Sequence, residues 1–333
     1  MINLVFNKTS KLFFILVLAM FLLIFTFFLN TAIAADDNSS FGYTVGPPVV
    51  EYTAERGQTI NGIVKVNDYS PTPIILYPQV ADFAAKDETG QPSFFESDPN
   101  RKFSLSSWMK FSDAPVEFGV GELKEIQYQI VVPTDAEPGG HYGVLFFSTK
   151  SPNEVKEGEA KVVANMKVGQ LVLVTVNGDV KENAVVETFK TKHLFNWFPQ
   201  VHYSNEKLLR ISANIDVVTR LKNVGNIHFK PKGTIEIKNI FGQEKANLTL
   251  NEKEGNVLPD SIRSFDNVWK ANWWNMGIYT ANLDFTYGVN NSNIIDNYTF
   301  IIIPWWLLII IALIVLFVIW KIKKHKKNIL AKI

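Results

Sequence analysis

Short strand-like runs dominate the chain from Phe41 to about Phe300. β-branched and aromatic residues alternate with polar ones, and Gly, Pro, Asn and Asp break the runs at close intervals, as in "TINGIVKVND", "KEIQYQIVVP" and "MKVGQLVLVTVNG". Alternation with a period of two is typical of strands that bury one face. No segment of helical length in this region shows a persuasive apolar period of 3.6 residues. The pattern therefore predicts an all-β fold built from sandwiches.

The order of features occurs twice along the chain. In "NGDVKENAVVET" the apolar alternation stops, and charged and turn residues take its place, which indicates a domain break. The stretch "GGHYGVLFF" before this break corresponds to "MGIYTANLDFTYG" after it. Tyr142 and Tyr279 therefore occupy equivalent places. The repeat predicts two tandem immunoglobulin-like β-sandwich domains, at residues 35–180 and 185–300, with the first enlarged by an insertion between residues 82 and 110.

The stretch "PTDAEPGGHYGVLFF" is expected to carry the chain from one sheet of the first sandwich to the other. Its prolines stiffen the crossing, and Gly139 and Gly140 would supply positive φ at the turn. A tyrosine just after such a corner commonly returns its hydroxyl to the backbone of its own loop, which is the role expected of Tyr142. His141 is also a candidate ligand or catalytic group, although no nucleophile or carboxylate motif accompanies it.

Both ends of the chain are apolar. Lysines, an apolar run and a small-x-small site predict a secretory signal peptide at residues 1–34, cleaved after Ala34. Residues 301–320 are almost wholly apolar and long enough to cross a bilayer as a helix, and the basic tail at 321–333 would stay cytoplasmic. The sequence thus predicts a single-pass type I protein of the cell membrane, with an extracellular ectodomain.

The region between the apolar ends is acidic. All 32 Asp and Glu residues lie there, whereas some of the 33 Lys and Arg residues lie outside it. This charge argues against a nucleic-acid partner and against holding acidic wall polymers by bulk charge. The chain has no cysteine, so its stability must come from ordinary cores without disulfides.

The motifs of several enzyme classes are absent. Neither nucleotide-binding glycine loops nor a serine-hydrolase elbow occurs, and the five histidines lack metal-ligand spacing. Asp82 and Asp135, or Glu51 and Glu55, can be imagined as a glycosidase pair, but sandwiches carry many carboxylates and spacing alone proves nothing. The sequence predicts a protein that is not an enzyme and needs no cofactor, metal or nucleotide.

Aromatic residues gather in "HLFNWFPQVHY" (193–203) and "VWKANWWN" (268–275). Packing in the core and between the domains explains most such clusters. Alternatively, they form an exposed face that stacks on sugar rings or docks a partner. Trp273 and Trp274 are adjacent, so if they lie in a strand, one of the two side chains must face away from the core of the sandwich. These two residues and His141 are the candidate binding residues.

Several segments resemble the WxL-interacting protein family of Gram-positive-type bacterial surface proteins. "FGYTVGPPVVEYTAERGQTINGIVKVND", "SSWMKF" and "VVPTDAEPGGHYGVLFF" follow the layout of the family's first domain, and "LKNVGNIHFKPKGTIEIKNIFGQ" is similar to its second. The resemblance covers nearly the whole chain. It implies a signal peptide, two Ig-like domains, a transmembrane helix and a basic tail. It also implies that the first domain binds peptidoglycan and the second a partner protein or host molecule, without catalytic residues.

Two functions remain open at this point. The favoured one is a membrane-anchored, non-enzymatic cell-surface protein that binds peptidoglycan or another surface protein. The alternative is a chaperone-like assembly factor for secreted or surface proteins that acts through a sheet edge. An exposed, unpaired edge strand would favour the second function, and an aromatic or polar face would favour glycan binding.

Overall fold

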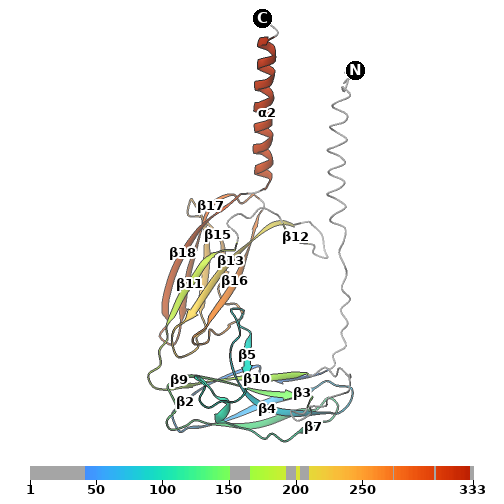
Figure 1. Cartoon of the computed structure of the whole chain (residues 1–333), viewed down its shortest axis with the longest axis vertical. Helices are drawn as coiled ribbons and strands as arrows, with labels where there is room; N and C mark the ends of the chain where they lie inside the picture. The colour runs from blue at the N-terminus through green and yellow to red at the C-terminus, as the bar shows by residue number, and fades with distance from the viewer. Residues whose placement is uncertain are drawn as a thin grey trace. The chain divides into compact units, whose positions relative to one another are not determined.

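The computed structural model describes most of the chain after residue 41 (Figure 1). The described residues are 42–150, 166–192, 200–202, 210–272, 274–303 and 305–330. The predicted signal peptide at 1–34 and most of the aromatic stretch 193–203 lie outside these ranges.

The first sandwich consists of two sheets. Sheet 1 has the order β1–β3–β8–β6 and contains β1 (Tyr43–Gly46), β3 (Thr59–Asp68), β8 (Leu123–Val131) and β6 (Met109–Lys110), the last preceded by the 3-10 turn η1 (Ser106–Trp108). Sheet 2 has the order β2–β10–β9–β4–β5 and contains β2 (Val49–Ala54), β10 (Lys167–Val176), β9 (Gly139–Ser148), β4 (Ile74–Ala85) and β5 (Pro92–Phe95), with β7 (Val116–Phe118) also paired to β4.

Alternation of side chains along the strands builds the core between these sheets. In β3, Val64 and Val66 are fully buried, whereas Ile63 and Lys65 on the opposite face are exposed. β9 departs from this pattern because all of its residues are buried. A strand buried on both faces needs a cover on its outer side. That cover comes partly from the second sandwich.

The crossing from β8 in sheet 1 to β9 in sheet 2 follows the expected path, but its two glycines differ. Gly139 has a positive φ of 122°, whereas Gly140 has none. Gly140 is needed for space, since a Cβ there would lie 1.9 Å from the Tyr142 hydroxyl oxygen. The expectation of positive φ is therefore right for Gly139 and wrong for Gly140.

The second sandwich also consists of two sheets. Sheet 3 is centred on β13 (Arg210–Asn223), which pairs with β11 (Ala184–Thr191), β12 (Gln200–His202) and β16 (Ile262–Asn272). Sheet 4 has the order β15–β14–β17–β18 and contains β15 (Glu244–Thr249), β14 (Lys232–Asn239), β17 (Gly277–Tyr287) and β18 (Ser292–Ile302). Its core includes Trp269, which packs edge-on against Tyr279. The Tyr279 hydroxyl donates to the carbonyl of Met276 in the preceding loop at 3.4 Å, as expected of a corner tyrosine.

The sequence after β18 differs from the expectation. Helix α2 (Trp305–Leu330) begins later than residue 301, because Ile301 and Ile302 belong to β18 and Ile302 is 3% exposed in the core. The apolar run that remains in α2 ends at Trp320, before Lys321, and is shorter than the ~20 residues that a spanning helix needs. Within the described part of the chain, no helix is both long and apolar enough to cross a lipid bilayer. The predicted transmembrane helix at 301–320, and the single-pass membrane location predicted with it, are therefore wrong.

Candidate functional site

The corner before β9 joins the two sandwiches. The backbone N–H of Gly140 donates to the carbonyl of Asn226 at 2.8 Å, and the Asn226 side-chain amide donates to the carbonyl of Pro138 at 3.1 Å. The Tyr142 hydroxyl accepts the backbone N–H of His228 at 3.0 Å and lies 3.2 Å from the ring Nδ1 of the same residue. The expectation that Tyr142 pins its own loop is therefore wrong. Its hydroxyl fastens the first sandwich to the second.

A second set of contacts comes from β2. Glu51 forms an ion pair with Lys230 at 2.9 Å, and its carboxylate also accepts the side-chain N–H of Asn256 at 2.8 Å. Both partners belong to the second sandwich.

The insertion predicted between residues 82 and 110 contributes the third set. The tip of the β4–β5 hairpin reaches the second sandwich, where Glu88 pairs with both Nε and Nη2 of Arg220 and its carbonyl accepts the N–H of Ser264. Further along the insertion, Lys102 pairs with Asp260 at 2.6 Å. The inserted residues therefore act as a strap between the domains.

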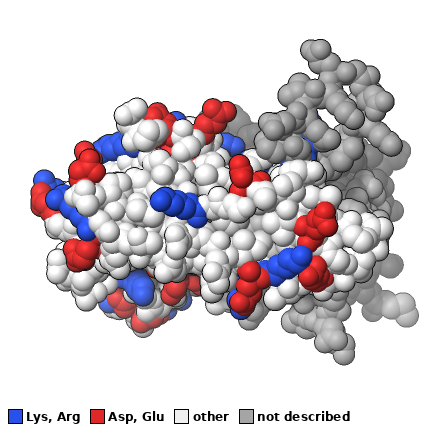
Figure 2. Space-filling view, turned by 90° about the horizontal axis from the view of Figure 1, so that it is seen from below, with Lys and Arg blue, Asp and Glu red and all other residues white. Residues whose placement is uncertain are grey.

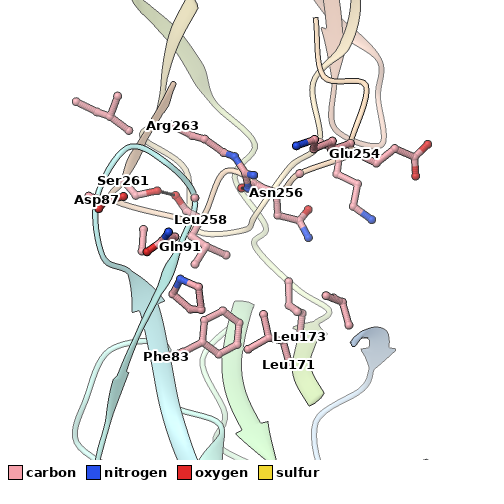
Figure 3. A pocket seen from close by; sticks show the side chains of 18 of the residues that line it. Phe83, Asp87, Gln91, Leu171, Leu173, Glu254, Asn256, Leu258, Ser261 and Arg263 are labelled. Carbon is pink, nitrogen blue, oxygen red and sulfur yellow. Dashed lines mark hydrogen bonds between the residues drawn. The ribbon is translucent and has the colours of Figure 1, made fainter. Parts of the chain in front are cut away.

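These contacts enclose a cavity of about 280 Å³, close to the lower end of small-ligand sites (Figure 3). Phe83, Leu171 and Leu173 of sheet 2 form an apolar floor. The opposite wall comes from the loop before β16, which carries Asn256, and from the start of β16, which carries Arg263. The arrangement combines an apolar surface with a few polar groups, which is typical of sites that bind amphipathic ligands.

Burial controls the ionisation of the groups beside the cavity. It lowers the pKa of His228 to about 4, against the opposing effect of the nearby Glu51 carboxylate. Burial alone would raise the pKa of Glu51, but hydrogen bonds from Asn256 and Lys230 outweigh it and lower that pKa. Burial also raises the pKa of Tyr142 far above its usual value. At neutral pH the junction therefore holds a neutral imidazole, a neutral phenol and a carboxylate paired with a lysine.

Strand β18 forms a separate feature at the edge of sheet 4. It pairs with β17 in unbroken register from Ser292 to Ile302, and among the described residues no strand pairs with its other side. Its outward side chains include Ile295, which is 69% exposed.

The sequence-predicted site residues lie apart from the cavity. His141 is buried, with its ring nitrogens 3.0 Å from the carbonyls of Ser104 and Glu137 and its ring tilted by 42° against the ring of Trp108. Trp274 is 62% exposed and Trp273 lies outside the described residues. A binding role for these three residues stays a prediction, and neither Trp274 nor His141 lines the cavity.

Sequence reasoning missed Asn256 and Arg263, which line the cavity, and considered Glu51 only as a carboxylate of a possible pair with Glu55. These residues are far apart in the chain, and none belongs to a motif. One sequence signal for the junction was available: the continuous apolar run in "HYGVLFF" indicates a strand that is buried on both faces. Asp82, considered above as a carboxylate of a possible enzyme pair, is buried and accepts hydrogen bonds from residues 104–106. In the described ranges, no group of three or more potential metal ligands is present.

Comparison with known proteins gives structural likeness only. No family model and no curated protein matches the sequence. Among solved structures, the class 5 fimbriae chaperone CfaA shares 13% identity with a TM-score of 0.36, covering 79% of this chain and 99% of that one. The YadV chaperone shares 8% identity with a TM-score of 0.36 over 78% and 100% of the two chains. A Salmonella enterica structure of the SafA pilin with the SafB chaperone shares 10% identity with a TM-score of 0.34 over 82% and 100%. Likeness at this level assigns neither a family nor a function to the chain.

Proposed function

We propose that this protein is a non-enzymatic binding protein that receives an extended segment of another protein as an added strand beside β18. One observation carries the proposal: β18 is a long, regular edge strand with a single charged residue, Asp296. Natural sheets protect long edges with charges, prolines, bulges or covering elements, because an open edge invites pairing with another chain.

The other edges in the described part of the chain carry such protection. Five of the other edge strands are short: β1, β5, β6, β7 and β12. The edge strands β11 and β15 have irregular pairing, because a register shift interrupts each of them. The edge of β2 is occupied in part by contacts of Glu51 with the second sandwich. Strand β16 is as long and regular as β18, but it carries Arg263, Asp266 and Lys270. Among these edges, β18 combines length, unbroken pairing and the fewest charges, with Asp296 on its inner face and β11 of the other sheet close to it.

The side chains beside this edge indicate what an added strand would contain. Every second residue of β18 lies on the outer face, and none of these residues is charged: Asn293, Ile295, Asn297, Thr299 and Ile301. On the inner side, Ile294 and Tyr298 are half-buried at the rim of the core. Main-chain hydrogen bonds would supply most of the affinity, and uncharged alternating side chains would fit both faces. The chaperone-like role is therefore favoured over wall binding. The lack of enzymatic activity stays a prediction.

Photo-crosslinking in the producing cells tests this function. A photoreactive residue at Asn297 should trap one partner protein, and mass spectrometry should place the crosslink in an uncharged alternating segment. The same residue at Val268 on the charged edge β16 is the control and should trap little. Ile295→Lys should abolish the Asn297 adduct, because a charge facing an added strand opposes pairing. Equal adducts at the two edges, or an adduct insensitive to Ile295→Lys, would disprove strand addition.

A second candidate, binding of peptidoglycan, has support from the outer face of sheet 1. Amide side chains of Asn61, Gln127 and Gln129 line a hollow of about 570 Å³ there, beside Phe111. Figure 2 shows acidic and basic side chains interspersed on the face seen from below, without a patch of one sign. Hydrogen bonding and stacking would therefore dominate. Co-sedimentation with purified sacculi at rising salt tests it, and binding that collapses with modest salt would refute it.

A further inference from the structure

We infer that the segment received by β18 is selected at two positions, by a cation opposite Asp296 and by a bulky apolar side chain opposite Ile301. The inference rests on the proposed function. It adds one Lys or Arg to the otherwise uncharged alternating segment described there, and it predicts the direction in which that segment runs.

Asp296 is a carboxylate at an apolar rim. It lies on the inner face of β18, half-buried between Ile294 and Tyr298, and both of these neighbours pack against the core of the second sandwich. In the described part of the chain, its carboxylate accepts a hydrogen bond from the backbone N–H of Asn297 at 2.8 Å and forms an ion pair with no Lys or Arg. The strand therefore presents a negative charge that the described residues leave without a cation.

A strand added beside β18 would enclose this carboxylate further. A residue directly opposite Asp296 would place its side chain on the same face, with about 5 Å between the two Cβ atoms. Strand β11 of the other sheet also lies close to β18. Removing a carboxylate from water is costly unless a cation compensates it, and like charges opposite each other destabilise a sheet. We therefore expect Lys or Arg at this position of the segment.

A second copy of this chain could not supply that cation through the same edge. Strand β18 contains no Lys or Arg. Pairing of two β18 edges would therefore leave both carboxylates without a partner. The charge favours a segment of another protein.

The second position lies in a row of exposed isoleucines across one end of sheet 4, which we call the end row. Ile301 of β18 pairs with Ile278 of β17, and the backbone N–H of Ile240, just after β14, donates to the carbonyl of Ile278 at 3.2 Å. All three side chains are exposed, although α2 follows β18 at the same end (Figure 1). Phe241, in the turn beside the end row, is 83% exposed. Adjoining exposed apolar side chains of this kind mark interaction sites.

An added strand would extend the end row by one member. Its residue opposite Ile301 would lie on the same outer face, and a bulky apolar side chain there would remove part of Ile301 from water. The end row is thus continuous with the edge of β18. We therefore assign both to one occupant.

The two positions fix the register and the direction of the segment. Asp296 and Ile301 are five residues apart and lie on opposite faces of β18. The described pairings within sheet 4 are all antiparallel. An antiparallel segment has its apolar residue first and its Lys or Arg five residues later, whereas a parallel segment has the reverse order.

The test uses the full chain and fluorescently labelled peptides whose binding is followed by anisotropy. The reference peptide has Val at inner positions and Thr at outer ones, with one outer Ile followed five residues later by an inner Lys. Replacing its Lys by Gln should weaken binding about fivefold, and replacing it by Glu at least about tenfold. Replacing its Ile by Thr, or reversing the order of the whole peptide, should weaken binding about fivefold.

Two protein variants locate the contacts. In Asp296→Asn the Lys and Gln peptides should bind equally, and in Ile301→Thr the Ile and Thr peptides should bind equally. Asp284→Asn changes an exposed charge on the outer face of β17, and Val289→Thr changes an exposed residue at the opposite end of sheet 4. Both are controls and should keep the preferences of the unaltered chain.

The outcomes separate this inference from the proposed function. If the Lys, Gln and Glu peptides bind equally and Ile295→Lys abolishes binding of all three, strand addition stands and the inference is overturned. If no peptide binds, or if Ile295→Lys leaves binding unchanged, the proposed function fails as well. A dimeric chain that Ile301→Lys converts to monomers would place a second copy on this edge and overturn the inference.

Discussion

Removal of the Tyr142 hydroxyl should weaken the junction between the sandwiches. Tyr142 is 2% exposed, and its hydroxyl accepts the backbone N–H of His228 at 3.0 Å. In Tyr142→Phe this N–H loses its partner in a place that water reaches poorly. An unsatisfied buried donor costs about 1–3 kcal/mol, and the lost contact with the imidazole Nδ1 adds to this. We expect the free energy of unfolding to fall by about 2 kcal/mol.

Urea denaturation of the full chain measures this change, with Tyr279→Phe as the matched control. Tyr279 occupies the equivalent place in the second sandwich, but its hydroxyl makes a long 3.4 Å bond to the adjacent loop. That substitution should cost less than about 1 kcal/mol. The transition that reports the first sandwich should shift only in Tyr142→Phe. An unchanged midpoint in Tyr142→Phe, or an equal loss in Tyr279→Phe, would refute the interdomain role of the hydroxyl.

Three further predictions concern the same junction. The pKa of His228 is lower in the folded state, about 4, than its ordinary 6.5, so the folded state binds this proton less readily. The contribution of His228 to the free energy of unfolding should therefore be fully present above pH 6.5, and the free energy should fall by up to ~3 kcal/mol as pH drops toward 4. Urea titrations at each pH measure this change. A His228→Gln variant should show a shallower fall. Glu88→Gln removes the charge of a partly exposed pair and should cost no more than about 1 kcal/mol, a loss that 0.5 M salt should largely reproduce in the unaltered chain. Gly139→Ala should lower the melting temperature far more than Gly121→Ala. Both glycines have positive φ, but only at Gly139 would the new Cβ meet a backbone carbonyl, at 2.6 Å.

The sequence predicted the sandwiches because alternation is a local property. Burial of Val64 and Val66 in β3, and the corner role of Tyr279, follow from patterns within a few residues. The role of Tyr142 could not be predicted in the same way. Its partner His228 is distant in the chain, and the equivalent tyrosine of the second sandwich, Tyr279, makes a different bond.

The end of β18 shows another limit of local reasoning. Ile301 and Ile302 read equally well as the start of an apolar helix or the last residues of a buried strand. Tertiary packing decided between them, since Ile302 fills the core of the second sandwich. The candidate site was beyond prediction for a related reason. Asn256 and Glu51 belong to no motif, and the folded structure alone shows that their side chains are hydrogen-bonded across the two sandwiches.

The burial of β9 on both faces has a consequence for synthesis of the chain. The first sandwich leaves the ribosome before the second exists, and its sheet 2 then exposes Phe83 and Leu173 without Leu258 to cover them. Nascent domains with such a face are prone to aggregate or to be held by cellular factors. During translation there is therefore an interval in which sheet 2 of the first sandwich is exposed. In that interval the chain, which we propose binds segments of other proteins, itself needs a factor that covers this surface.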